Sequence, residues 1–335
     1  MYAGTYGGQH FCMLDTVNMV NNIKQEISKG YKKVIFDNIN EAVYFDIIRK
    51  IHKIIRLLDN PNIEYYYLCS AYNGQDVYES YCKKNKINPI LTVKCSNLFE
   101  VHQKGNLEYY NSITNSSYVE YSPTPKSKLF CCFNKMPREH RINIFYNILK
   151  SGFLEKTYSS FQYGHDIINQ TFRDKQLVDT FKQHKDIFPL MLNMSDERQN
   201  PVDVRQGDFI YHSDSYFSLI TETLFYKDYI EAGESIFLTE KTFRPIIHKH
   251  PFILVAPTHS LKYLEDLGYK TFSPFINESY DSIEDDNKRF NEVWKEVERL
   301  CSFSPKEWSE WQHGIIDIVN HNFKILMNKN SGIIK

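Results

Sequence analysis

The chain has 335 residues, and at ~100–200 residues per domain this length predicts two domains or one large one. Hydrophobic residues make up 42% of the sequence and charged residues 24%, which excludes a disordered chain. The net charge of −1 offers no global basic field, so nucleic acid is not expected as a partner. No apolar run reaches the ~18–20 residues that span a bilayer. The first twelve residues do not resemble a signal peptide, so we expect a cytoplasmic protein without a membrane span.

The seven cysteines are scattered and include no C-x-x-C pair. Structural zinc sites usually show such closely spaced pairs, so the sequence does not predict one. Free, partly buried thiols in a reducing compartment are the expected state.

The first 120 residues alternate between helical and strand patterns. Apolar residues recur at helical spacing in some segments, and short apolar runs bounded by polar residues lie between them. The pattern predicts helices at 16–29, 42–58 and 76–84, and strands at 32–36, 63–69 and 89–94. Such alternation is typical of βαβ units and a parallel sheet.

A polar stretch at 111–128 (NSITNSSYVEYSPTPKSK) interrupts this alternation. A shift of composition of this kind marks a linker, so we place the domain boundary there, giving domains 1–125 and 126–335. The second half predicts strands at 129–133, 208–220, 251–256 and 270–272, and helices at 139–151, 243–248, 260–267 and 282–300. A last helix starts at Ser304, where Ser-Pro-Lys-Glu is a strong start signal.

The expected fold class is therefore α/β, in two halves with a cleft between them. In such sheets, ligands bind beyond the carboxyl ends of the strands. Clefts between domains are also common places for small-molecule sites.

The segment from Thr239 to Arg244 (TEKTFR) has the densest chemistry in the chain. With Thr239 as N-cap, Glu240 and Lys241 lie on the first turn of a helix, where free backbone N–H groups favour an anion. Lys241 and Arg244 are three residues apart and share a face, an arrangement that suits a diphosphate. A capped helix with a solvated charged face is the alternative interpretation.

The motif FLTEK, with SLITET upstream and PFILVAP downstream, resembles the donor-binding region of the α-1,3-fucosyltransferase family. The resemblance covers about residues 129–272 and extends to KLFCCFNKMPREHR. It implies a GT-B fold, which consists of two Rossmann-like domains with a cleft between them. It also implies a nucleoside-diphosphate-sugar, most simply GDP-fucose, held by the C-terminal domain, and an inverting transfer to a hydroxyl of a glycan. The segments EKTFRPI and GYKTF also look like glycosyltransferase-like proteins of large DNA viruses and phages.

The resemblance assigns the donor ribose to Glu240 and the diphosphate to Lys241, with Arg141 or Arg138 as a second phosphate cation. Glu222 falls where the family has a Glu-Asn pair, and Thr223 replaces the Asn here. Tyr211 leads toward the SLITET segment and could line the donor pocket. The expected donor-binding set is Arg138, Arg141, Tyr211, Glu222, Thr239, Glu240, Lys241 and Arg244.

An inverting transfer needs a general base that deprotonates the acceptor hydroxyl. Asp37 follows the predicted strand at 32–36, and Glu41 lies four residues further on. Either carboxylate could be this base, or could cap the helix predicted to start near residue 42. His10, in a Gly-Gly-Gln-His segment, is a third candidate.

No D-x-D motif of the kind that holds a divalent cation against a diphosphate occurs in the sequence. Cations and a helix terminus can stabilise the leaving diphosphate, so we expect no metal and no cofactor besides the nucleotide-sugar co-substrate. The pair His248 and His250 could bind a metal, but solvated residues at a helix end are the favoured interpretation.

These observations predict a metal-independent glycosyltransferase whose partners are a nucleotide-sugar donor and a glycan acceptor. Two alternatives stay open. One is a glycosyltransferase that acts on modified DNA bases, which would need a basic channel. The other is a glycan- or partner-binding protein that kept the fold without turnover.

Overall fold

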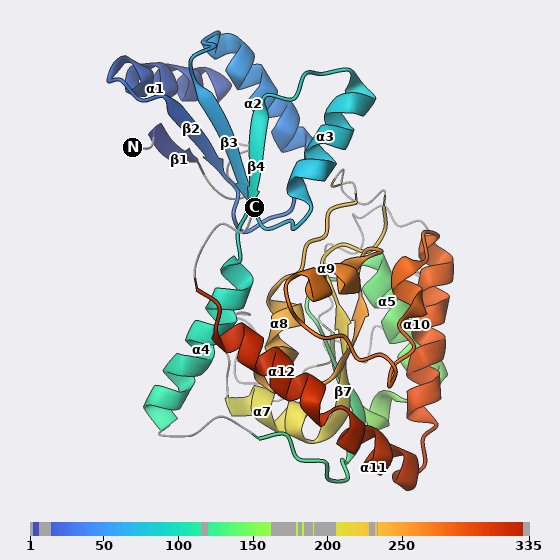
Figure 1. The fold of residues 1–335 in the computed structure, drawn as a ribbon. Helices are drawn as coiled ribbons and strands as arrows, with labels where there is room; N and C mark the ends of the chain where they lie inside the picture. The colour runs from blue at the N-terminus through green and yellow to red at the C-terminus, as the bar shows by residue number, and fades with distance from the viewer. Residues whose placement is uncertain are drawn as a thin grey trace. The chain divides into compact units, whose positions relative to one another are not determined.

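The computed structural model describes residues 3–6, 15–114, 120–161, 179, 183, 190, 206–227, 232 and 234–330. The chain forms two compact units (Figure 1). The first unit comprises Met1–Leu98, Tyr226–Leu238 and Asn330–Lys335, and the second comprises Phe99–Phe225 and Thr239–Lys329. Each unit holds one four-stranded sheet. Within the described residues, no helix combines the length and the apolar character needed to cross a membrane.

The first unit is a parallel α/β layer with strand order β1-β2-β3-β4. Its predicted helices and strands are confirmed to within three residues at each end, and β1 is an additional strand that the sequence did not predict. In chain order the elements are β1 (Ala3–Tyr6), α1 (Thr16–Ser28), β2 (Lys33–Asp37), α2 (Phe45–Leu58), β3 (Glu64–Cys69), α3 (Gly74–Asn85) and β4 (Leu91–Cys95).

The core of the first unit lies between the sheet and its helices. Alternate residues of the strands are buried, such as Val34 and Phe36 in β2, and helix α2 buries a stripe that includes Ile48, Ile51 and Ile54. These periods of two and of three to four residues are those that placed the strands and helices in the sequence.

The second unit has a parallel sheet with strand order β6-β5-β7-β8. All seven residues of β7 are buried, as expected for a strand covered on both faces. The second Rossmann-like domain of the predicted α/β fold is therefore confirmed. Its strands are β5 (Lys128–Asn134), β6 (Tyr158–Phe161), β7 (Ser215–Thr221) and β8 (Phe252–Val255), and its helices include α5 (Glu139–Lys150), α7 (Gln206–Ser213), α8 (Glu240–Ile247), α9 (Ser260–Asp266), α10 (Asp286–Cys301), α11 (Pro305–Gly314) and α12 (Ile316–Met327).

The order of these strands creates a topological switch point. From β5 the chain passes through α5 to β6 on one side, whereas β7 pairs with the other side of β5. Helices that leave neighbouring strands in opposite directions open a crevice at the carboxyl ends, and ligands of open α/β sheets bind there.

Three predicted elements of the second unit are wrong in detail. The predicted strand at 208–220 is helix α7 followed by strand β7, because the eight residues of α7 are too few to distinguish the helical period from the period of a strand. The predicted strand at 270–272 is irregular. The last helix is two helices, α11 and α12, although its predicted start at the Ser304 capping box is confirmed.

The two units divide at Leu98, earlier than the predicted boundary near residue 125. Helix α4 (Leu98–Thr114), which the sequence did not predict, belongs almost entirely to the second unit. Its Glu100 is fully buried, accepts a hydrogen bond of 2.8 Å from the Tyr269 hydroxyl and pairs with the Lys329 ammonium at 3.2 Å. By this division, residues 111–128 fall within the second unit.

Removal of the Glu100 carboxylate should destabilise the second unit. In Glu100→Ala the Lys329 ammonium and the Tyr269 hydroxyl lose their buried acceptor. We expect the free energy of unfolding to fall by about 3–5 kcal/mol, measured by urea unfolding. The control is Glu108→Ala in the same helix, where a half-exposed side chain lies 4.0 Å from Lys104. It should change stability by less than about 1 kcal/mol, and equal effects of the two substitutions would contradict the role of Glu100.

Candidate functional site

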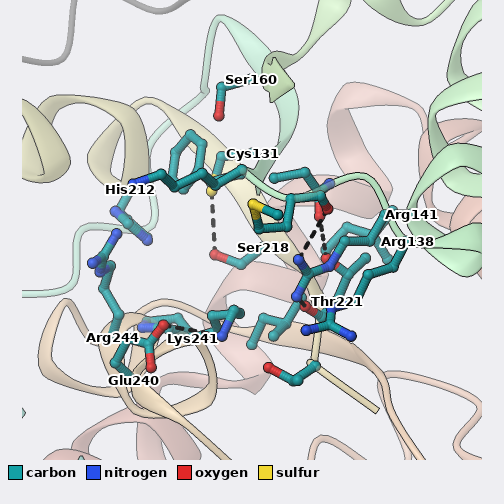
Figure 2. A pocket seen from close by; sticks show the side chains of 18 residues that line it. Cys131, Arg138, Arg141, Ser160, His212, Ser218, Thr221, Glu240, Lys241 and Arg244 are labelled. Atoms are coloured by element: carbon teal, nitrogen blue, oxygen red, sulfur yellow. Dashed lines mark hydrogen bonds and ion pairs between the residues drawn. The ribbon is translucent and has the colours of Figure 1, made fainter. Parts of the chain in front are cut away.

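A cavity of about 260 Å³ opens at the switch point of the second unit (Figure 2). The carboxyl halves of β5 and β7 form its wall, the loop after β5 and the start of α5 form one side, and the start of α8 forms another. The lining residues are Cys131, Phe133, Asn134, Lys135, Met136, Arg138, Arg141, Ser160, His212, Ser218, Leu219, Ile220, Thr221, Thr223, Glu240, Lys241, Arg244 and Pro245. We call this cavity the switch-point pocket.

Positive charge dominates the polar lining of the switch-point pocket. Among the described residues that line it, five are Lys or Arg and one, Glu240, is a carboxylate. The cations are Lys135, Arg138, Arg141, Lys241 and Arg244. Figure 2 shows Arg138 and Arg141 on one side of the pocket and Lys241 and Arg244 on the other. Such a lining suits an anion that reaches both sides.

The start of α8 is capped as the sequence predicted. Thr239 is the N-cap, and its hydroxyl accepts a hydrogen bond of 3.4 Å from the Lys241 backbone N–H. The Thr242 N–H donates to the Thr239 carbonyl at 3.0 Å. These two amides are therefore occupied within the cap, and the side chains of the first turn, rather than its free N–H groups, are what the helix presents to the pocket.

Glu222 follows β7 and anchors this cap. Its carboxylate is fully buried and accepts four hydrogen bonds. They come from the backbone N–H of Thr223 at 3.2 Å, the N–H and hydroxyl of Thr239 at 2.8 Å each, and the Thr242 hydroxyl at 2.6 Å. Glu222 does not line the pocket. Its contacts fix where α8 starts relative to the end of β7.

Lys241 lies among three oxygen groups. Its ammonium donates to the Thr239 hydroxyl at 2.7 Å and to the Glu240 carboxylate at 3.0 Å, and it lies 3.8 Å from the Glu222 carboxylate. Burial favours the neutral acid of Glu240, but the neighbouring Lys241 and Arg244 cations outweigh it and hold the pKa of Glu240 below its ordinary value. Glu240 is therefore ionised at neutral pH and can accept hydrogen bonds from a ligand.

Arg141 in α5 is buried and ties the two central strands together. Its guanidinium donates to the carbonyl of Met136 at 3.2 Å and to those of Thr221 and Glu222 at 3.1 Å each. Burial, and then the neighbouring Arg138 cation, lower the pKa of Arg141 to about 10, which leaves it charged at neutral pH. Arg138 is the N-cap residue of α5 and lines the pocket beside it.

His140 packs behind this wall. Its Nε2 donates to the carbonyl of Glu222 at 2.9 Å, and its ring stacks on Phe225 with 5.5 Å between the ring centres. Burial, and then the Arg141 cation, hold the pKa of His140 well below 6.5. The imidazole is therefore neutral in the folded protein.

The structure brings together six of the eight predicted donor-binding residues. Arg138, Arg141, Glu240, Lys241 and Arg244 line the pocket, and Thr239 caps the helix that presents three of them. Glu222 acts from behind the wall. Tyr211 does not line the pocket and instead packs edge-on against Tyr158 and Phe133.

The predicted base candidates Asp37 and Glu41 belong to the first unit, whereas the pocket belongs to the second. The Asp37 carboxylate accepts from the Ile39 N–H at 3.0 Å, and that of Glu41 accepts from the Tyr44 hydroxyl at 3.2 Å. Neither residue caps α2, whose N-cap is Tyr44, so that alternative is wrong. His10 lies outside the described residues.

His248 and His250 are buried, which contradicts their interpretation as solvated residues. The turn between α8 and β8 carries both rings inward, toward His212 at the end of α7. Burial, and then the neighbouring His212, hold the pKa values of His248 and His250 well below 6.5. A histidine pair separated by one residue gave no sign of this burial, because its cause lies in distant elements.

Sequence reasoning missed the pocket residues Lys135, Cys131 and Ser218. Cys131 and Ser218 lie within apolar strands and face each other across the β5–β7 pair, with their side-chain heteroatoms 3.2 Å apart. The signal available in the sequence was that each small polar atom interrupts an otherwise apolar strand that leads into a polar loop.

No family model and no curated protein sequence matches the chain. Among solved structures, it is similar to an alpha,alpha-trehalose-phosphate synthase (UDP-forming) from Burkholderia vietnamiensis, at 7% sequence identity and a TM-score of 0.47, with 97% of this chain and 72% of that chain covered. A UDP-forming synthase of the same name from Burkholderia xenovorans gives 7% identity and a TM-score of 0.46, with 97% and 71% covered. Similarities at these identities and TM-scores support no conclusion about activity, so the function is inferred from the pocket.

The buried, neutral His140 makes stability depend on pH. In the unfolded chain the imidazole takes up a proton near its ordinary pKa of 6.5, whereas in the folded protein it does not. The stability that a neutral His140 contributes is therefore present above pH 6.5 and is lost as pH falls below it. Between about pH 7.5 and pH 5.5 this loss amounts to about 1.4 kcal/mol.

We expect the free energy of unfolding of His140→Gln, measured by urea unfolding, to fall by about 1.4 kcal/mol less between about pH 7.5 and pH 5.5 than that of the unsubstituted protein. The reason is that Gln can donate to the same carbonyl without titrating. His313→Gln, at an exposed residue of α11, is the control and should leave the pH dependence unchanged. An unchanged pH dependence in His140→Gln would show that the folded protein admits the proton at this position.

Proposed function

We propose that the chain is a glycosyltransferase that transfers a sugar from a nucleoside-diphosphate donor, most simply GDP-fucose, to a hydroxyl of a glycan. The transfer is inverting and needs no divalent cation at the diphosphate. The observation that carries this proposal is the switch-point pocket, in which five cations from two sides surround one ionised carboxylate. The base, the ribose and the diphosphate of a nucleotide-sugar require different surroundings, and the pocket offers each of them.

The diphosphate fits between the two cationic sides of the pocket. Lys241 and Arg244 extend from the first turns of α8, and Arg138 extends from the start of α5 (Figure 2). Guanidinium groups bind phosphate oxygens in pairs, and an ammonium acts as a point charge, so the set can neutralise a diphosphate. Arg141 holds the strand ends with its hydrogen bonds and adds its charge to the lining of the pocket.

Glu240 suits the ribose. Its ionised carboxylate can accept hydrogen bonds from two hydroxyls, the role that acidic residues have in dinucleotide-binding folds. Phe133, Leu219, Ile220 and Pro245 supply apolar surface in the same pocket, which a nucleobase can cover.

The choice of GDP-fucose as donor rests on the resemblance of FLTEK and its flanks to the α-1,3-fucosyltransferase family. Thr223 stands where that family has Asn, and Thr242-Phe243-Arg244 also departs from its pattern. The donor proposal is therefore tested directly against other bases and sugars.

The chemistry divides between stabilisation of the leaving group and proton removal. Cations around the diphosphate stabilise the charge that develops as the bond to the sugar breaks, which is the task that a divalent cation performs elsewhere. The acceptor hydroxyl loses its proton to a base, for which Asp37 and Glu41 of the first unit stay the candidates.

Thermal unfolding with GDP, UDP, CDP, dTDP and ADP tests donor binding. A ligand at 100 times its dissociation constant adds about 2.7 kcal/mol, which raises the melting temperature of a chain of this length by about 4 °C. We expect such a shift with GDP, of equal size with and without Mg²⁺. A larger shift with another base would reassign the donor. No shift with any diphosphate would overturn the proposal, and a shift that requires Mg²⁺ would overturn its metal-free part.

Lys241→Ala should sharply reduce or abolish the shift caused by the diphosphate. Because the substitution also removes the cation beside the Glu222 and Glu240 carboxylates, the shift is read against the melting temperature of the same variant without ligand. We expect the affinity for the diphosphate to fall at least about tenfold, the size expected for a lost charge-assisted contact. Lys262→Ala is the matched control, since Lys262 is an exposed lysine in α9 that pairs with Asp266. Undiminished nucleotide affinity in Lys241→Ala would remove Lys241 from the site.

A further inference from the structure

A second cluster of reactive side chains lies on the inner side of the switch-point pocket, where the proposed donor chemistry does not use it. Cys131 of β5, His212 of α7 and His250 before β8 bring one ligand atom each to within 4.8 Å of one another. Their exposed fractions are 2%, 4% and 3%. One sulfur and two imidazole nitrogens from three separate elements converge here, on side chains that are almost fully buried.

The hydrogen bonds of His250 set its ring as a metal ligand needs it. Its Nε2 lies 2.9 Å from the carbonyl of Ser215 and must carry the proton, since a carbonyl can only accept. The lone pair is therefore on Nδ1, which lies 2.8 Å from the Ser218 hydroxyl, and that hydroxyl lies 3.2 Å from the sulfur of Cys131. A histidine held by a carbonyl through one nitrogen presents the other to a metal.

His248 supplies an independent observation. It is 6% exposed, and neither of its ring nitrogens has a hydrogen-bond partner among the described residues. Its ring stacks on that of His212, with 4.2 Å between the ring centres and 17° between the planes. Buried polar atoms without partners are rare and costly, and a bound ion is one way in which a protein satisfies them.

We propose that Cys131, His212 and His250 bind a resident zinc ion, with His248 turning its ring to complete the shell. One thiolate and neutral imidazoles are the ligands that zinc takes in four-coordinate sites, and the mixture of sulfur and nitrogen disfavours Mg²⁺ and Ca²⁺. Ligand atoms of a tetrahedral zinc shell lie about 3.3–3.8 Å apart, so small side-chain movements from the present spacing suffice. On binding, the Cys131 thiol releases its proton to solvent.

Two cavities give the ion a way in. Cys131, His212 and Ser218 line the switch-point pocket, and His212, His248 and His250 line a second cavity of about 210 Å³ on the other side of the cluster. The ion would join α7 to the sheet and to the turn after α8. It is a resident ion held by protein ligands, and the proposal does not depend on the identity of the donor.

The test is the metal content of the full chain, purified from cells grown with added zinc and dialysed against metal-free buffer. We expect one zinc ion per chain, and its loss in Cys131→Ser and in His250→Gln. Cys132→Ser is the matched control: Cys132 is the next residue of β5 and equally buried, but it lies outside the cluster, so this variant should keep its zinc.

Cobalt replacement guards against variants that lose zinc only because they misfold. Co²⁺ added to the metal-free, unsubstituted protein should give a thiolate-to-cobalt charge-transfer band and the strong visible bands of a tetrahedral site, and zinc should displace it. Cys132→Ser should give the same spectrum, and Cys131→Ser should lack the charge-transfer band. Unsubstituted protein that holds no zinc and shows no charge-transfer band would overturn the proposal, as would a band that persists in Cys131→Ser.

The outcome is separable from that of the donor proposal. The zinc measurements use no nucleotide, and the nucleotide shifts are read against the same protein without ligand. Zinc without nucleotide binding would support this site and refute the donor proposal, and nucleotide binding without zinc would do the reverse.

Discussion

The architecture of the pocket depends on one buried carboxylate. Glu222 is fully buried at the end of β7, and its two oxygens accept four hydrogen bonds, three of them from Thr239 and Thr242 at the start of α8. Its backbone carbonyl accepts from His140 and Arg141 of α5 on the other side. A single residue thereby connects the two helices that carry the cations of the pocket. A buried carboxylate is costly unless its acceptor positions are filled and a cation lies near, and here both conditions hold.

This arrangement keeps like charges close before any ligand arrives. Arg141 is fixed by three carbonyls, and Lys241 is held by Thr239 and by the carboxylate of Glu240, so each cation is held in place on its side of the pocket. The lowered pKa of Arg141, caused by burial and then by Arg138, shows that the protein bears a cost for this charge. An anionic ligand relieves that cost, and a preorganised set of charges loses little free energy in ordering itself around the ligand.

The sequence predicts a structural feature well when the residues that determine the feature are close together in the chain. The cap at Thr239 is predictable because an N-cap depends on about four consecutive residues. Most strands of both sheets are predictable as short apolar runs between helical segments. Helix α7 resembles a strand in sequence because its few residues fit both periods. The composition predicts a boundary near residue 125, whereas the two compact units divide at Leu98 by contacts between distant residues, such as that between Glu100 and Tyr269. His248 and His250 pack against the ring of His212, which is far from them in the sequence, so no local pattern predicts their burial.

The pocket therefore has two kinds of surface, and the sequence indicates one of them more clearly than the other. Its mouth is made of charged residues next to turns, where polar composition already indicates a binding site. Its inner side is made of Cys131, Ser218 and His212, single polar atoms within apolar or ambiguous segments, which composition assigns to the core. The same two strands support both surfaces, since β5 and β7 carry Cys131 and Ser218 within their length and lead to Arg138 and Glu222 beyond their ends. A residue that stiffens the middle of this strand pair therefore also bears on the position of the cations at the mouth of the pocket.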